Sequence, residues 1–355
     1  MAESGNILVL YTELMGYTEA SFEAVARLSG CMVTAVQRDT GKTRAYVPRG
    51  SERLRLLPRS EHGRTSLLRL YQELSPKLLY VAGWQDRDYL AVAREALRDG
   101  IPVVMGMDNQ WSGSVRQRLA CFAAPFRLKP YFSHIQVAGV RQYEYARRLG
   151  YAQDRILLNE YSADTTLFLA DGGGEEHRRA YPRRLLYVGR FHENKGLDVL
   201  EKAWGMVGDE SGWELVLIGN GLLGSEWEKL PRVTVMDFLQ PKDLAKEAGR
   251  AGAFVLPSRR EPWGVVVHEF AAAGLPLVLS SSCGAATEFL IPGYNGFLFE
   301  TEDAGSLASS LRQLFTLAEG ELRTMGERST TLAGRISPET AAANLLSVLS
   351  QSSSL

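Results

Sequence analysis

Apolar and polar positions alternate along the first half of the chain in a way that predicts strands separated by helices. Short apolar runs at GNILVLYTE, CMVTAVQRD, KLLYVAG, IPVVMGM and FSHIQVAG are typical of buried strands. Amphipathic stretches between them predict helices, and the first of these, TEASFEAVARLSG, ends at Gly30. This order predicts a doubly wound parallel α/β domain.

The second half repeats the alternation after a polar, glycine-rich segment, DGGGEEHRR, that predicts a linker near residues 164–174. A final amphipathic helix begins after Ser337, a residue type that caps helix N-termini. We therefore expect a first domain over residues 1–165, a second over 166–335, and a C-terminal helix over 336–355.

The stretch from Ser258 to Ser282 predicts a strand–turn–helix–strand unit. Pro262 fits the first turn of a helix, and Gly264 lets a ligand approach the backbone closely. This places Glu261 at the mouth of the helix and Glu269 about two turns inside it.

Both carboxylates have two interpretations. Glu261 could be a solvated charge favoured by the helix dipole, and Glu269 a surface residue. However, Glu269 lies within HEFAAAG, among residues small and apolar enough to be buried, where an acid needs a partner. Parallel α/β sheets bind ligands at the carboxyl ends of their strands, which favours a functional interpretation.

The pattern E-P-W-G-x-x-x-x-E followed by A-x-x-G-x-P resembles the E-x7-E signature of retaining glycosyltransferases of family 4 (glycosyl transferases group 1). Those enzymes have the GT-B fold, in which two Rossmann-like doubly wound domains face each other across a cleft. Four further segments are similar to segments of that family and occur in the same order: LLYVGRFHENKGLDVL, WELVLIGNG, VLPS and TEFLIPGYNGFLF. The resemblance is strong over residues 160–335 and only architectural before them.

The resemblance implies roles for four residues of the second domain. Arg190 and Lys195 would neutralise the donor diphosphate, Glu269 would bind the ribose hydroxyls, and Glu261 would contact the sugar at an oxocarbenium-like centre. It also implies that no metal and no cofactor is required, and that retention follows from same-face attack. The remaining donor contacts that it implies are Gly189, Gly219, Phe238, Leu239, Gly264, Val265 and, from the first domain, Gly16.

On the acceptor side the resemblance implies loops of the first domain. Many family members have a histidine after the strand that here ends in Met107-Asp108-Asn109, so a different base or acceptor geometry is expected. The residues that we assign to this side are Trp84, Asp108, Asn109 and Tyr17.

The predicted function is therefore transfer of a sugar from a UDP- or GDP-sugar to an acceptor hydroxyl, in polysaccharide, glycolipid or glycoside biosynthesis. The acceptor would be a glycan, a lipid-linked molecule or a small molecule. One alternative is a nucleotide-sugar epimerase or binding protein of the same fold. Another is an NAD-dependent oxidoreductase, because GNGLLG matches G-x-G-x-x-G and Asp237 follows the next strand. The short SEWEKL helix and the mid-domain position of GNGLLG argue against it.

Composition points to a cytoplasmic protein. The three cysteines, Cys31, Cys121 and Cys283, are odd in number and far apart, which favours neither disulfides nor a zinc site. No apolar run is long enough to cross a membrane, and the N-terminus lacks the basic start of a secretory signal.

Charge is unevenly distributed, with 22 Lys+Arg against 17 Asp+Glu in residues 1–165 and 18 against 24 in the remainder. Much of the excess is a run of arginines: Arg44, Arg49, Arg53, Arg55, Arg59, Arg64 and Arg69. Such a run is typical of a solvated face. The alternative is a patch that attracts an anionic acceptor or the inner face of a membrane, which would make the protein peripheral there. The interleaved aromatics of a nucleic-acid groove are missing, so nucleic acid is not an expected partner.

Overall fold

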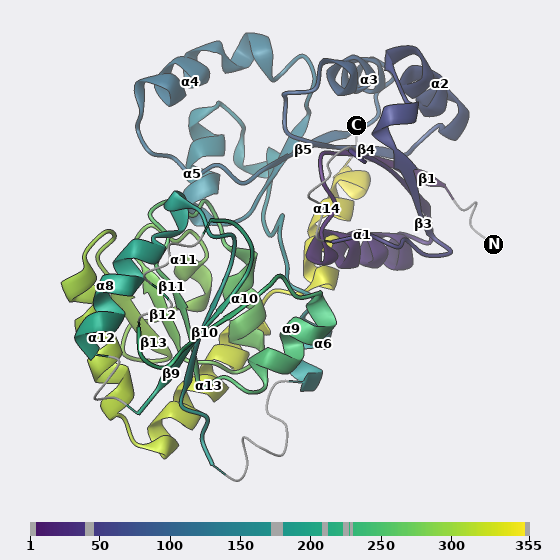
Figure 1. Ribbon diagram of the computed structural model, residues 1–355. Helices are drawn as coiled ribbons and strands as arrows, with labels where there is room; N and C mark the ends of the chain where they lie inside the picture. The colour runs from purple at the N-terminus through teal and green to yellow at the C-terminus, as the bar shows by residue number, and fades with distance from the viewer. Residues whose placement is uncertain are drawn as a thin grey trace. The chain divides into compact units, whose positions relative to one another are not determined.

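The computed structural model describes residues 5–39, 46–171, 180–207, 212–222, 227 and 230–351. The chain forms two compact units: unit 1 comprises residues 1–162 with 336–355, and unit 2 comprises residues 163–335 (Figure 1). The division lies close to the predicted boundary. Most of the glycine-rich linker segment, residues 172–179, lies outside the described residues.

Unit 1 is built on a parallel sheet whose seven described strands lie in the order β3-β2-β1-β4-β5-β6-β7. In chain order these strands are β1 (Asn6–Tyr11), β2 (Met32–Gln37), β3 (Leu54–Pro58), β4 (Leu78–Ala82), β5 (Val103–Met107), β6 (His134–Val137) and β7 (Ile156–Leu157). In the register of the sheet, Ile7 of β1 pairs with Val33 of β2 on one side and with Leu78 of β4 on the other. All pairs are parallel, as the strand–helix alternation predicts.

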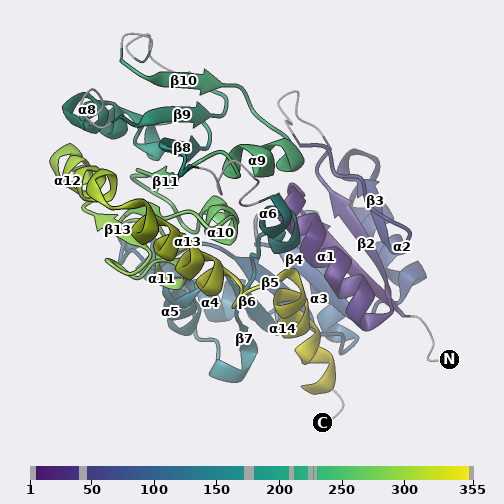
Figure 2. The ribbon, with the colours of Figure 1, turned by 90° about the horizontal axis from the view of Figure 1, so that it is seen from below.

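Helices cover both faces of this sheet (Figures 1 and 2). They are α1 (Gly16–Ser29), α2 (Arg64–Leu74), α3 (Arg87–Arg98), α4 (Val115–Arg127), α5 (Val140–Arg148) and α14 (Pro338–Gln351). Leu8 and Leu10 pack in the core beneath α2 and α3, whereas Ile7 and Val9 pack in the core beneath α1 and α14. Since side chains alternate along a strand, burial on both faces explains why β1 is apolar throughout.

The C-terminal helix α14 belongs to unit 1, where it packs along α1. Ser337 accepts a hydrogen bond from the Thr340 amide at 3.2 Å, which confirms the predicted cap. Arg27 of α1 forms an ion pair with Glu339 of α14. The last helix is therefore joined to the first by apolar packing and by a surface charge pair.

Unit 2 is built on a second parallel sheet, whose described strands lie in the order β10-β9-β8-β11-β12-β13. In chain order these strands are β8 (Arg184–Val188), β9 (Glu214–Ile218), β10 (Val233–Met236), β11 (Ala253–Leu256), β12 (Leu277–Ser280) and β13 (Gly296–Phe299). The described helices are α6 (Thr165–Asp171), α8 (Leu197–Val207), α9 (Pro241–Ala248), α10 (Val265–Ala272), α11 (Ala286–Phe289), α12 (Ala304–Thr316) and α13 (Glu319–Ala333).

Aromatic side chains fill the core of unit 2. Phe254 of β11 stacks on Phe270 of α10 with ring centroids 4.4 Å apart. Trp213 stacks on Phe315 of α12 at 4.7 Å, and Trp204 of α8 meets the same ring edge-on at 6.2 Å. Such pairs add to the energy of apolar burial and fix the helices against the sheet.

Three local predictions need correction. Pro262 lies before the helix, because Gly264 has φ +94° and α10 begins only at Val265; Glu269 is therefore about one turn inside α10, not two. Residues near 164–174 were predicted as a linker, yet Thr165–Asp171 is helix α6 of unit 2. Helix α4 was not predicted at all.

Candidate active site

The strand order of unit 2 places a candidate site between β8 and β11. From β8 the chain proceeds outward to β9 and β10, then returns to the other side of β8 at β11. Ligands of open α/β sheets bind at such a switch point, beyond the carboxyl ends of the two strands. Here the loop after β8 carries Arg190 and Lys195, and the loop after β11 carries Ser258 and Glu261.

Lys195 and Glu261 meet at this switch point. The Lys195 ammonium donates to Glu261 Oε2 in an ion pair, and Ser258 Oγ donates to the same oxygen at 3.0 Å. Glu261 is only 8% exposed, so its carboxylate requires these donors. Lys195 and Glu261 were both predicted as site residues, whereas Ser258 was not.

Backbone contacts hold Glu261 in position. Residue 261 forms a parallel bridge with Cys283, and its carbonyl accepts the Gly284 amide at 3.0 Å. Ser280 Oγ and Ser282 Oγ both donate to the Ser258 carbonyl, at 2.6 and 2.5 Å. The loop after β11 is thus fastened to the segment after β12, which explains how an isolated turn keeps a buried acid in one place.

The glycines of the site have steric reasons to be glycine. Gly264 has φ +94°, a left-handed conformation, and a Cβ there would lie 3.0 Å from the Glu261 Cγ. A Cβ on Gly219 would overlap the Gly189 carbonyl, because the turns after β8 and β9 lie against each other. Gly189 donates its amide to the Ile218 carbonyl at 3.0 Å. These glycines allow the backbones at the switch point to pack closely.

Glu269 of α10 is partly accessible, and its carboxyl group is surrounded by protein. Burial raises the pKa of Glu269 to about 7, with a further contribution from the nearby Asp164. Val265 is the first residue of α10. Glu269 is therefore half-buried within unit 2, and its role in binding stays a prediction.

The other predicted donor residues lie on neighbouring loops of unit 2. Arg190 is exposed, and its carbonyl accepts a hydrogen bond from the Tyr187 hydroxyl at 3.1 Å. Phe238 and Leu239 are half-buried and follow β10, two strands away from β8. They lie at the carboxyl edge of the same sheet as Lys195 and Glu261.

Unit 1 has its own switch point, between β1 and β4. Gly16 is the first residue of α1 and follows the loop after β1, and Tyr17 packs edge-on against Tyr161 with ring centroids 5.5 Å apart. Trp84 follows β4 and packs against the apolar core beneath α3. Trp84 therefore has a packing role in unit 1, and its assignment to the acceptor side stays a prediction.

Asp108 and Asn109 follow β5, and a buried acid lies beside them. Asn109 Nδ2 donates to Asp108 Oδ1 at 3.2 Å. Glu160 accepts a hydrogen bond from the Tyr80 hydroxyl at 3.2 Å. Burial, reinforced by the charge of Asp108, raises the pKa of Glu160 well above its usual range. Sequence reasoning missed Glu160, because no local pattern marks it and its partner Tyr80 is 80 positions away in the sequence.

Glycine at position 106 makes this arrangement possible. A Cβ on Gly106 would overlap both the Tyr80 hydroxyl and Glu160 Oε1. Tyr80 of β4 and Glu160, which follows β7, therefore meet in the space that a side chain at position 106 of β5 would occupy. Two carboxyl groups, one of them with a pKa raised by its surroundings, thus lie near each other at the carboxyl edge of unit 1.

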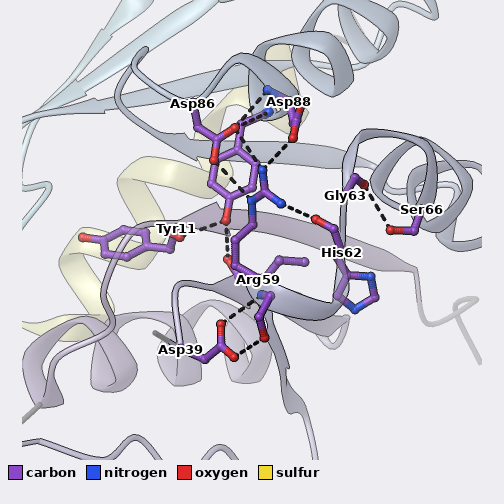
Figure 3. Close-up of polar contacts among 11 residues, drawn as sticks. Tyr11, Asp39, Arg59, His62, Gly63, Ser66, Asp86 and Asp88 are labelled. Atoms are coloured by element: carbon purple, nitrogen blue, oxygen red, sulfur yellow. Dashed lines mark hydrogen bonds and ion pairs between the residues drawn. The ribbon is translucent and has the colours of Figure 1, made fainter. Parts of the chain in front are cut away.

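One residue of the predicted arginine run is a structural residue (Figure 3). Arg59 donates to Asp88 at 2.7 Å and to Asp86 at 3.2 Å, and its guanidinium lies over the Tyr89 ring. The Tyr89 hydroxyl in turn donates to the Tyr11 carbonyl at 3.1 Å. Although burial opposes it, the hydrogen bond from Arg59 lowers the pKa of Asp86. The interpretation of the whole run as solvated or membrane-attracting is therefore wrong for Arg59.

Other sequence-based expectations concern cysteines, metals and membranes. All three cysteines are free thiols. Among the described residues, no cluster of His, Cys, Asp and Glu has the arrangement of a metal site, and no helix has the length and hydropathy of a membrane span. Of the GNGLLG segment, Gly219 follows β9 and lies against the turn after β8, whereas Leu223, Gly224 and most of the SEWEKL segment lie outside the described residues.

One family model matches a segment within unit 2, the unit that carries the Lys195–Glu261 pair. Residues 182–316 match the model of the family described as glycosyl transferases group 1. A glycogen synthase of Mycobacterium tuberculosis is 34% identical over 145 residues, which are 38% of this chain and 34% of that protein. A D-inositol 3-phosphate glycosyltransferase of Corynebacterium kroppenstedtii is 30% identical over 205 residues, 52% of this chain and 45% of that protein. The chain thus spans less than half of the length of either relative.

Comparisons with solved structures match the whole chain. Sucrose-phosphate synthase from Thermosynechococcus elongatus superposes with a TM-score of 0.75 at 21% identity, covering 98% of both chains. Anabaena HepE in complex with UDP superposes with a TM-score of 0.74 at 16% identity, covering 98% of this chain and 100% of that one. The predicted fold, two Rossmann-like domains of the GT-B type, is confirmed.

Proposed function

We propose that this protein is a retaining glycosyltransferase that moves a sugar from a nucleoside diphosphate donor to an acceptor hydroxyl. The single observation that carries the proposal is the Lys195–Glu261 ion pair at the switch point of unit 2. The family match over residues 182–316 supports it, since that segment contains both residues. Solved relatives in complex with UDP and UDP-glucose support a nucleotide-sugar donor, for which UDP-sugars and GDP-sugars are the candidates.

In the proposed reaction Lys195 changes partner. A donor diphosphate carries more negative charge than one carboxylate, so it would compete with Glu261 for the Lys195 ammonium. Release from Lys195 would leave the Glu261 carboxylate able to accept hydrogen bonds from the sugar and to stabilise positive charge at its anomeric carbon. Lys195 and the exposed Arg190 would stabilise the charge that develops on the leaving phosphate. We propose that these cations make a metal ion unnecessary.

Donor orientation would come from α10. Its first amide groups follow Gly264 and are unpaired within the helix, so they offer partial positive charge to a phosphate. Glu269 would accept hydrogen bonds from the ribose hydroxyls, and the base would lie against the backbone near Phe238 and Leu239. The acceptor hydroxyl would bind at the loops of unit 1 that carry Tyr17, Asp108 and Asn109. As the bond between the anomeric carbon and the phosphate breaks, this hydroxyl would attack from the same face, and the leaving phosphate would take its proton.

A thermal-shift panel tests the donor site. Wild type and Glu269→Ala are heated with UDP, GDP, ADP or NAD, each with chelator present. A ligand at a hundred times its Kd stabilises the folded state by about 2.7 kcal/mol, which is readily detected. We expect UDP or GDP to stabilise the wild type, and most of that shift to be lost in the variant.

The other outcomes decide against the proposal. Stabilisation by NAD alone would favour an oxidoreductase that uses the GNGLLG segment. A response to UDP or GDP without any donor hydrolysis, on prolonged incubation with the matching nucleotide sugar, would favour a binding protein. An epimerase would convert the sugar while leaving the nucleotide attached.

A further inference from the structure

Helix α4 presents apolar side chains to solvent. Val115, Leu119, Phe122 and Phe126 are 73%, 64%, 82% and 79% exposed. They follow one another at intervals of four, three and four residues, so the helical period places them on one face. Large apolar side chains exposed singly are ordinary, whereas a contiguous stripe marks an interaction surface.

The opposite face of α4 packs against the core of unit 1. Ala124 is buried, and Cys121 and Leu128 pack against the core of unit 1. A surface helix normally has one apolar face toward the core and a polar face toward water. Helix α4 has two apolar faces, and the core explains only one of them.

Cationic side chains flank the exposed stripe. Arg116 and Arg118 lie on either side of it at the first turn, and Arg127 lies at the last; all three are exposed. Between Asp108 and Glu144 the sequence contains five basic residues and no acidic one: Arg116, Arg118, Arg127, Lys129 and Arg141. The surface around α4 is therefore positive as well as apolar.

We propose that α4 lies on an anionic lipid surface, with Leu119, Phe122 and Phe126 entering the boundary between headgroups and acyl chains. Phenylalanines with flanking arginines on one helix face are the combination that interfacial helices use, since apolar burial and attraction to anionic headgroups act together. A second copy of the chain would bring its own Arg116, Arg118 and Arg127 against these, which disfavours self-association through this face. The surface is distinct from the arginine run of residues 44–69, of which Arg59 forms internal ion pairs.

Vesicle co-sedimentation tests the proposal without any assay of activity. The full chain is mixed with vesicles of phosphatidylglycerol and phosphatidylcholine in equal amounts, or of phosphatidylcholine alone. We expect binding to the anionic vesicles to be at least about tenfold stronger and to weaken as salt is raised. The triple variant Leu119→Ser, Phe122→Ser, Phe126→Ser should bind at least about a hundredfold more weakly, because three exposed apolar groups no longer enter the bilayer.

Two further variants make the test specific. Arg116→Gln, Arg118→Gln and Arg127→Gln together should remove the preference for anionic vesicles. The matched control, Leu28→Ser with Met206→Ser, changes exposed apolar residues of α1 and α8 and should bind as the wild type does. Circular dichroism and the thermal midpoint check that each variant is folded.

Wild type that binds neither vesicle, or a triple serine variant that binds as tightly as wild type, would overturn the proposal. Light scattering measures the oligomeric state and so tests whether α4 docks on a second copy. A wild-type dimer that becomes a monomer in the triple variant, without vesicle binding, would mean that α4 docks on a second copy instead.

Discussion

Lys195 and Glu261, which lie 66 positions apart in the sequence, form an ion pair in the folded chain. One belongs to the loop after β8 and the other to the loop after β11, and these strands are neighbours in the sheet. Each was predicted to contact a different part of the donor. Because each is the ion-pair partner of the other, the two residues have to be tested together.

Replacing either residue should abolish most of the activity. We expect Lys195→Ala and Glu261→Ala each to lower turnover by at least about a hundredfold, the scale of losing one group that stabilises developing charge. The fold-reduction of turnover in the double variant should be smaller than the product of the two single fold-reductions, because the effects of residues that act as a unit are not additive. Initial rates with the nucleotide sugar identified by the thermal-shift panel provide the measurement.

The matched control for this experiment is Lys202→Ala, an exposed lysine of α8 in the same unit. It should leave turnover unchanged. Wild-type-like turnover in Lys195→Ala or Glu261→Ala would remove these residues from the mechanism. A fall in thermal midpoint without loss of turnover would assign the ion pair to stability alone, since removing one partner leaves the other charge partly buried.

Glu269 should make stability and donor binding depend on pH. Its folded-state pKa is raised to about 7, above the unfolded value near 4.5, so the folded state holds the proton more tightly. The stability that this proton contributes is fully present below about pH 4.5 and is lost as pH rises to about 7. Denaturant titrations across this range should show the loss in wild type and a flatter dependence in Glu269→Gln.

Binding of the nucleotide should change in the opposite direction. Ribose hydroxyls donate hydrogen bonds, so they favour the ionised carboxylate, and nucleotide affinity should rise between about pH 6 and 8 in wild type. Affinity that does not vary with pH in wild type, or that varies equally in Glu269→Gln, would contradict the assignment of Glu269 to the ribose.

The parallel sheets and the Glu261–Glu269 unit could be predicted because they depend on local patterns. Continuous apolar runs identify strands buried on both faces, and the turn residues between them mark the loops. The predicted start of α10 was too early, since Pro262 is equally suited to the first turn of a helix and to the turn before it. The left-handed conformation of Gly264 places the start of the helix after position 264.

What could not be predicted depends on residues that are distant in sequence. Glu160 is recognisable as a buried acid only once Gly106 and Tyr80 are placed beside it by neighbouring strands. Helix α4 escaped prediction because apolar residues lie on both of its faces, which weakens its periodicity, and because Pro125 interrupts its pattern. The periodicity argument assumes that apolar residues point toward the core, and that assumption fails on an interaction surface.

Gly106 should be intolerant of a side chain. In Gly106→Ala the new methyl group would overlap the Tyr80 hydroxyl and the Glu160 carboxyl, so we expect a loss of about 1–3 kcal/mol in the free energy of unfolding. Gly205 of α8 is the control, because it is exposed, helical and has open space at its Cβ. Gly205→Ala should stabilise by about 0.4–1 kcal/mol. Urea denaturation measures both, and an unchanged stability in Gly106→Ala would mean that the Tyr80–Glu160 contact is easily rearranged.

His268 joins the beginning and the end of unit 2. Its Nδ1 accepts the Ala163 amide at 3.0 Å, so its Nε2 carries the proton and donates to the Ala333 carbonyl, also at 3.0 Å. The imidazole is fully buried and stacks on Phe289 with ring centroids 4.2 Å apart. Ala163 is the first residue of unit 2, and Ala333 lies two residues before its last, Arg335. One side chain therefore holds the chain at both ends of the unit.

Replacing His268 distinguishes the contribution of its two hydrogen bonds from that of its packing on Phe289. Phenylalanine keeps the stack on Phe289 but removes both hydrogen bonds, and we expect His268→Phe to lose about 1–3 kcal/mol in the free energy of unfolding. Asparagine has an oxygen that accepts the Ala163 amide, so His268→Asn should recover part of the amide's protection from hydrogen exchange even though it loses the stack. Exchange at Ala163 that is equally slow in wild type and His268→Phe would show that the histidine does not hold this point of entry.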